Sequence, residues 1–201
     1  MAVSRVKTSS ILQGFPKSRS LLAGNAYFQP TAYESIATTT VGAGGTSTIT
    51  FSSIPSTYTH LQIRGIGRSD AASGNSWIYL RFNGDSGTNY ASHYLRGNGT
   101  AASASALTGA GNNTEQRLGD FPRADATSGI FGVGVIDILD YTNTNKYKTT
   151  RFLGGADKNG SGVVSLYSSV WLSTSAVTSI TLTPQTDNWV QYSSFALYGI
   201  K

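Results

Sequence analysis

The chain contains no cysteine and only one methionine among its 201 residues. The absence of cysteine excludes disulfide bonds, thiolate catalysis and cysteine-ligated metal sites. No apolar run approaches the ~20 residues that a membrane-spanning helix needs, so we expect no membrane contact. Gly14 and Pro16 interrupt the basic N-terminal segment, and we therefore expect no secretory signal.

Charged residues are also scarce, at 12% of the chain, and the net charge of +5 is unevenly placed. Residues 1–33 hold Arg5, Lys7, Lys17 and Arg19 and no acidic residue, whereas the remainder has eleven basic against ten acidic residues. Nucleic-acid-binding domains depend on clustered basic side chains that contact phosphates. Because the body of this chain is nearly neutral, we do not expect nucleic acid as a partner.

Small polar residues and 23 glycines dominate the composition, and they separate segments in which apolar and polar residues alternate. Such alternation predicts β-strands, and short connections between strands require antiparallel pairing. The sequence therefore predicts an all-β fold, an antiparallel two-sheet β-sandwich of the jelly-roll type over residues 34–201, preceded by an extended N-terminal arm, residues 1–33. The strands are expected at 34–41, 46–54, 58–69, 76–83, 90–96, 114–121, 128–141, 146–154, 161–173, 176–184 and 188–200.

We make more specific predictions for two segments of the chain. Residues 97–113 are small and poor in apolar side chains, which predicts a mobile surface loop, because nothing in them offsets the entropy lost on ordering. Residues 128–141 are apolar on both faces, so we expect the most buried strand there. Gly132 and Gly134 should lie beneath large aromatic side chains or at a bend of the sheet.

No sequence motif of a nucleophilic, phosphate-binding or dinucleotide-binding site is present. His60 and His93 lack the spacing of metal ligands. Residues 83–89, "NGDSGTN", offer alternating oxygen ligands as calcium loops do, but a hairpin turn uses the same residues, and we favour the turn. Asp137 and Asp140 suggest a pair of glycosidase carboxylates, although charged groups at a strand end are the better interpretation. We therefore expect no catalytic residue, no cofactor and no metal.

Trp77, Tyr79 and Arg81 share one face of a predicted strand. They form a possible binding face for a host glycan, or they belong to the core or to a subunit interface, since sandwiches also bury large aromatic side chains. Both interpretations stay open at this point.

The N-terminal arm combines apolar residues with basic flanks, and Gly14 and Pro16 exclude one continuous amphipathic helix. An irregular arm of this kind suits docking on a neighbouring subunit; the alternative is that it packs on its own domain. The residues expected to dock are Arg5, Lys7, Ile11, Leu12, Phe15, Pro16, Lys17, Arg19, Leu21 and Leu22.

Three runs of the sequence resemble a module that is common in structural proteins of tailed bacteriophages, notably phages of cyanobacteria and marine bacteria. They are "YESIATTTVGAGGTSTITFSSIPSTYTHLQIRGIGRSD", "IYLRFNGDSGTNY" and "VTSITLTPQTDNWVQYSSFALYGIK". The opening "AVSRVKTSSILQGFPKSRSLLAGN" is similar to a lead-in that some of these proteins carry. The resemblance covers nearly the whole chain, contains no catalytic motif and implies a virion component with a β-sandwich body.

We accordingly expect a non-enzymatic virion structural protein, made in the cytoplasm of the bacterial host and located on the surface of the phage particle. The first expectation is a capsid decoration or cement protein whose arm binds the major capsid protein or another virion protein. We expect a homo-oligomer, with a trimer favoured. The alternative is a tail, neck or fibre-tip component whose sandwich binds a host surface glycan. Small size and a single body favour decoration, because fibres are usually longer and repetitive.

Overall fold

A computed structural model describes residues 32–72, 75–107 and 113–201. These residues form twelve β-strands and no helix, so none of them forms a helix that could cross a membrane. The strands are β1 (Tyr33–Thr40), β2 (Ile49–Phe51), β3 (His60–Gly67), β4 (Asn75–Phe82), β5 (Tyr90–Gly97), β6 (Ala102–Leu107), β7 (Gln116–Pro122), β8 (Gly132–Ile138), β9 (Lys148–Asp157), β10 (Gly162–Trp171), β11 (Ile180–Pro184) and β12 (Ser194–Ile200).

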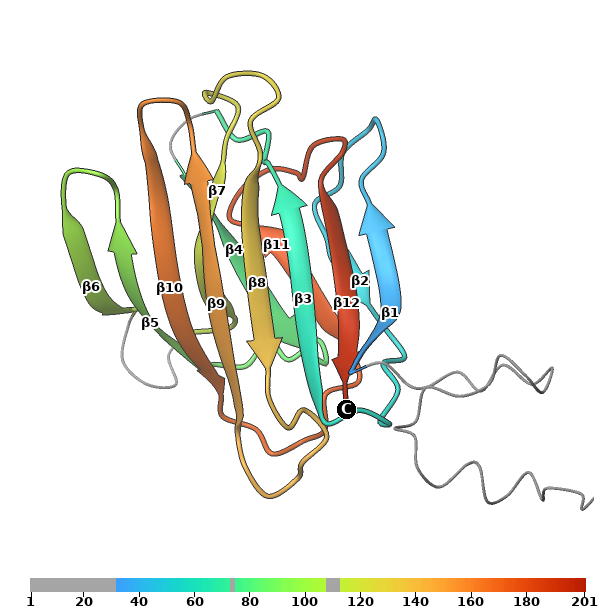
Figure 1. The fold of residues 1–201 in the computed structure, drawn as a ribbon. Coiled ribbons are helices and arrows are strands. Elements are labelled where there is room, and N and C mark those ends of the chain that lie inside the picture. The colour runs from blue at the N-terminus through green and yellow to red at the C-terminus, as the bar shows by residue number, and fades with distance from the viewer. Residues whose placement is uncertain (1–31, 73–74, 108–112) are drawn as a thin grey trace, which may run out of the picture. The chain divides into compact units, whose positions relative to one another are not determined.

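The strands form two antiparallel sheets packed as a sandwich, which confirms the prediction of an all-β, two-sheet sandwich. The larger sheet has eight strands in the order β1-β12-β3-β8-β9-β10-β5-β6, and the smaller has four in the order β2-β11-β4-β7. In Figure 1 the larger sheet faces the viewer with the smaller one behind it, β1 at one edge and β6 at the other. Strand β7 of the smaller sheet packs against β9, β10 and β5, and the larger sheet continues past it to β6.

The core lies between the two sheets and follows the alternation of the strands. On β4, Ile78, Leu80 and Phe82 are buried, and on β12 Phe195 and Leu197 are buried. Burial of one such side chain contributes about 1.5–3 kcal/mol, so the inner faces supply the main stabilisation. The aromatic members of the core are Phe51, Phe82, Tyr90, Phe121, Tyr141, Phe152, Tyr167, Trp171, Trp189 and Phe195.

The ring of Phe152 fills a space that glycines on three strands leave open. A Cβ atom on Gly119 of β7, Gly134 of β8 or Gly154 of β9 would overlap this ring. The prediction that Gly134 lies beneath a large aromatic side chain is therefore confirmed. Gly132 instead packs against Pro122.

Two expectations about single segments were wrong. Residues 97–113 are not one loop, because Ala102–Leu107 forms β6 and pairs with β5 in continuous register. Backbone hydrogen bonds hold this strand, and they require no apolar side chain. The segment 128–141 is buried on one face only: Ile136 and Ile138 are in the core, but Val133 is 55% exposed, because no strand of the described residues covers the outer face of the larger sheet.

Candidate functional site

The register of the larger sheet aligns aliphatic side chains from four strands on its outer face. Val135 on β8 pairs with Leu153 on β9, Leu153 pairs with Leu166 on β10, and Leu166 pairs with Leu95 on β5. We call these four residues the apolar row. Leu153 is 56% exposed and Leu95 is 55% exposed, although side chains of this size are most often buried.

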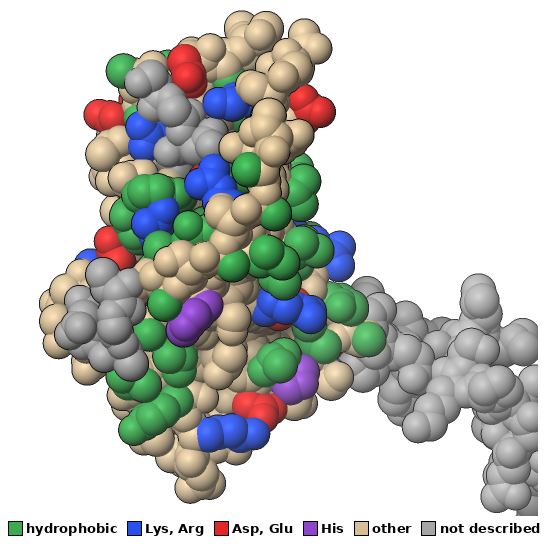
Figure 2. Space-filling model, turned by 90° about the vertical axis from the view of Figure 1, so that its left-hand side faces the viewer, with side chains coloured by type: hydrophobic (Ala, Val, Ile, Leu, Met, Phe, Trp, Pro, Cys, Tyr) green, Lys and Arg blue, Asp and Glu red, His purple; other side chains and the backbone are tan. Residues whose placement is uncertain are grey.

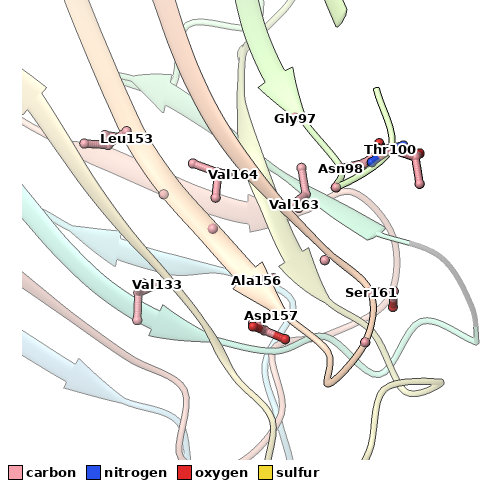
Figure 3. Close-up of a pocket in the computed structure, with 15 residues that line it drawn as sticks. Gly97, Asn98, Thr100, Val133, Leu153, Ala156, Asp157, Ser161, Val163 and Val164 are labelled. Carbon is pink, nitrogen blue, oxygen red and sulfur yellow. Dashed lines mark hydrogen bonds between the residues drawn. The ribbon is translucent and has the colours of Figure 1, made fainter. Parts of the chain in front are cut away.

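A second line of residues beside the apolar row alternates large side chains with glycine. Val133 pairs with Gly155, Gly155 with Val164, and Val164 with Gly97. Val133 and Val164 project from the sheet, whereas the glycines leave hollows between them. An open pocket lies here, lined by β8, β9 and β10 and by the turn between β5 and β6, from which Asn98 and Thr100 come (Figure 3).

The two lines join into one apolar surface, which we call the outer apolar face. It consists of Ile66, Leu95, Val133, Val135, Leu153, Val164 and Leu166. Figure 2, which looks onto the side of the molecule that carries β6, shows hydrophobic side chains over the middle of the view with basic side chains among them. Contiguous apolar surface of this kind marks places where proteins bind other proteins or ligands.

Polar side chains border the outer apolar face on the next line of the sheet. Gln62 Nε2 donates a hydrogen bond to Asp137 Oδ1 at 2.8 Å, and Arg151 Nη2 donates to Asp137 Oδ2 at 2.6 Å. Arg64 Nε donates to Gln62 Oε1 at 2.8 Å. Both oxygens of Asp137 are therefore engaged, which supports the interpretation of this residue as a charged group near a strand end.

Asp140 lies beyond the end of β8 in a turn, where its φ is 48°. Its carboxylate pairs with Lys146 and lies 3.5 Å from Nδ1 of His60. The hydrogen bond from Lys146 keeps the pKa of Asp140 below its usual value. A carboxylic acid catalyst needs the opposite shift, so the geometry of Asp140 favours a role in the turn.

Trp77, Tyr79 and Arg81 lie together on one face of β4, opposite the buried Ile78, Leu80 and Phe82, and all three are partly buried. The guanidinium of Arg117 lies over the ring of Trp77. Arg81 Nη2 forms an ion pair with Glu115 Oε2 at 3.2 Å, and burial raises the pKa of Glu115. Neighbouring side chains thus cover part of this face. Its role in glycan binding stays a prediction.

A charged cluster between the sheets was missed by sequence reasoning. Asp120 on β7 has no exposed surface, and Arg96 Nη2 on β5 lies 3.6 Å from its Oδ1. Burial raises the pKa of Asp120, and the charges of Arg96 and Arg117 oppose that rise. The Trp77 indole and the Tyr167 hydroxyl also favour the charged carboxylate, but neither meets the geometry of a hydrogen bond to it. In the sequence, an acidic residue within a strand of alternating apolar and polar residues gives no sign that its side chain is buried.

The segment 83–89 forms a tight turn that uses its own polar groups. Asp85 Oδ1 accepts a hydrogen bond from the Gly87 backbone at 2.8 Å. Asp85 Oδ2 accepts from Asn89 Nδ2 at 2.9 Å and from the indole of Trp171 at 2.6 Å. These contacts support the turn interpretation. Among the described residues, no group of three His, Cys, Asp or Glu side chains could hold a metal ion.

The residues of the predicted docking arm, from Arg5 to Leu22, lie outside the described residues. Comparison with family models, with curated proteins and with solved structures finds no match. The functional argument therefore rests on the outer apolar face and on the phage-protein resemblance of the sequence.

Proposed function

We propose that this chain is a non-enzymatic structural protein of a tailed-phage particle, most simply a capsid decoration or cement protein. In this role it binds the major capsid protein or another virion protein and adds buried surface between neighbouring subunits of the shell. The particle surface is then its location. The observation that carries the proposal is the outer apolar face, whose exposed leucine and valine side chains offer a surface for another protein.

The body of such a protein is proposed to be a jelly roll. The order β1-β12-β3-β8 in one sheet and β2-β11-β4-β7 in the other supports this. Consecutive strands of this set alternate between the sheets, except β4 and β7, which are neighbours in the smaller sheet, and two Greek keys have this arrangement. On this interpretation the hairpins β5–β6 and β9–β10 are insertions that extend the larger sheet. They supply Leu95, Leu153, Val164 and Leu166, four of the seven residues of the outer apolar face.

The N-terminal arm is proposed to act as a second attachment device. Its apolar anchors include Phe15 and Leu22, and one buried side chain of this size is worth about 1.5–3 kcal/mol. Deletion of residues 1–30 should leave a folded body that no longer incorporates into particles. Replacing Phe15 and Leu22 by Ala should weaken incorporation more than replacing Lys17 and Arg19 by Gln, since salt screens the attraction between charges but not apolar contacts.

The copy number in purified particles is the first test of the proposal. Hundreds of copies per particle are expected for a decoration protein, measured by quantitative mass spectrometry against the major capsid protein. A handful of copies would assign the chain to the neck or the tail, and absence from purified particles would overturn the proposal.

A matched pair of variants tests the outer apolar face. Leu153→Asp places a charge in the apolar row, whereas Thr50→Asp places the same charge on an exposed position of β2 in the smaller sheet. We expect Leu153→Asp to reduce incorporation into particles by roughly tenfold or more, because one apolar contact of this size is lost. Thr50→Asp should incorporate normally. Equal incorporation of both variants would show that this face is not the attachment surface.

The second candidate function is that of a tail, neck or fibre-tip component that binds a host glycan through Trp77, Tyr79 and Arg81. Their placement on one face of β4 supports it. The stacking of Arg117 on Trp77 weighs against it, because a sugar platform needs a free face of the ring. Loss of host adsorption on replacing Tyr79 and Arg81, at unchanged incorporation, would favour this candidate.

A further inference from the structure

Strand β6 has no neighbouring strand on one of its two sides in the described fold. It is the outermost strand of the larger sheet and pairs only with β5. The hydrogen bond from Asn98 N to Ala101 O, at 3.1 Å, fixes which residues point toward β5. Because the pattern alternates in antiparallel pairs, Ala102, Ala104 and Ala106 direct their N–H and C=O groups away from β5, toward the open edge.

This edge carries none of the features by which proteins prevent strands from pairing with other chains. Its sequence, "ASASAL", contains no charge and no proline, and its register with β5 has no bulge. The opposite edge of the sheet is protected, because β1 carries Glu34 and has an irregular register between Ser35 and Ala37. In the smaller sheet, β2 has only three residues and β7 packs against β9 and β10.

Burial of side chains within one copy of the chain does not explain why β6 forms a strand. All of its residues except Leu107 are exposed, so neither face of the strand is covered by the body. Hydrogen bonds to β5 hold it in place, and Asn113 Nδ2 donates a further one to Leu107 O at 2.9 Å. Except for Ala106 O, which accepts a hydrogen bond from Ser105 Oγ at 3.0 Å, the outward groups of Ala102, Ala104 and Ala106 have no partner among the described residues. A strand with such an open side and small side chains on both faces can accept another strand without steric conflict.

We propose that β6 pairs with β6 of a second copy of this chain, antiparallel and about a two-fold axis at Ala104. Ala104 then lies opposite Ala104 of the second copy, and Ala102 lies opposite Ala106. These three pairs place outward N–H and C=O groups against each other, as hydrogen-bonded antiparallel pairs require. The two larger sheets become one continuous sheet across the axis.

A second copy suits this edge better than another strand for two reasons. The strand is uncharged, so two copies meet without repulsion, whereas the arm of a neighbouring copy would bring four basic residues to an edge that offers no acidic one. The register also places Ala104 directly beside Leu95, at the end of the apolar row. Pairing at Ala104 therefore joins the apolar rows of the two copies and doubles the surface assigned to particle binding under the proposed function.

Cysteine cross-linking of the purified full-length chain tests the pairing and its register, because the natural chain has no cysteine. With a short bismaleimide, Ala104→Cys should give cross-linked dimers, since the two Cα atoms would lie about 5.5 Å apart. Ala102→Cys alone should not react in this way, but a mixture of Ala102→Cys and Ala106→Cys should. Thr38→Cys is the control, because Thr38 is exposed at the opposite end of the same line of residues.

The mass in solution gives an independent measurement. Light scattering should show a concentration-dependent dimer for the natural chain and for Thr38→Lys, and a monomer with an unchanged circular dichroism spectrum for Ala104→Lys. A natural chain that is monomeric at all concentrations, or a trimer that Ala104→Lys leaves intact, would overturn the proposal. These measurements need no phage particles, so their failure is distinguishable from failure of the proposed function.

Discussion

The guanidinium of Arg96 lies 3.6 Å from the carboxylate of Asp120, and this ion pair joins the two sheets. Arg96 belongs to β5 of the larger sheet, and Asp120 belongs to β7, the edge strand of the smaller sheet that packs against β5. Asp120 is fully buried, while the side chain of Arg96 keeps 23% of its surface exposed. Desolvation of the carboxylate outweighs its attraction to the two arginines, and its pKa is therefore raised.

The first prediction concerns the pH dependence of this pair. A raised pKa in the folded state means that the folded protein binds the Asp120 proton more tightly than the unfolded chain does. As the pH falls from neutrality through the raised pKa, the natural protein should therefore gain stability relative to Asp120→Asn. The gain should level off below the ordinary value of 3.8. Urea unfolding of both proteins over a pH series measures the difference, and a difference that stays flat or falls toward acid pH would contradict the assignment.

The second prediction concerns the space around Phe152. Gly134→Ala places a methyl group where the ring lies, and overpacking of this kind costs about 1–3 kcal/mol in the free energy of unfolding. Gly97→Ala is the matched control, since a Cβ at Gly97 meets nothing within 4 Å. Phe152→Leu should recover part of the stability in the Gly134→Ala background but destabilise the natural protein. Independent, additive effects of the two changes would show that they do not share this space.

The fold was largely predictable from the sequence because most strands keep one face in the core. The alternation on β4 separates Ile78, Leu80 and Phe82 from Trp77, and the structure places the two sets on opposite faces. The alternation of apolar and polar residues cannot predict a strand that buries neither of its faces. Strand β6 has no apolar face to reveal it, and its existence depends on pairing with β5.

The candidate site was not predictable, because it arises from register between strands that are distant in sequence. Val135, Leu153 and Leu95 become neighbours only when β8, β9, β10 and β5 are placed side by side. In the sequence, the apolar character of residues 128–141, which include Val135, suggested burial on both faces of that strand alone. Asp120 shows the opposite case, since an acidic residue in a strand normally indicates exposure.

The third prediction concerns the turn at residues 83–89. Both oxygens of Asp85 already accept hydrogen bonds, from Gly87 and Asn89 in the turn and from the indole of Trp171. Calcium chloride should therefore leave the melting temperature unchanged. Asp85→Ala should destabilise the protein by about 1–3 kcal/mol, because the buried indole N–H loses its acceptor. A clear rise in melting temperature with calcium that Asp85→Ala abolishes would restore the calcium interpretation.

The fourth prediction concerns catalysis. Asp137 is held by Arg151 and Gln62, and Asp140 by Lys146, so neither carboxylate is free to act as an acid or a nucleophile on a glycan. Asp137→Asn and Asp140→Asn should leave any cleavage of host-envelope glycans by purified particles unchanged, measured as release of reducing sugar. The stability cost of Asp137→Asn should be small, about 0–1 kcal/mol, because its partner Arg151 is 69% exposed and exposed ion pairs contribute little. Loss of cleavage in particles that retain normal protein content and an unchanged melting temperature would show that one of these carboxylates is catalytic, and the structural role would then have to be abandoned.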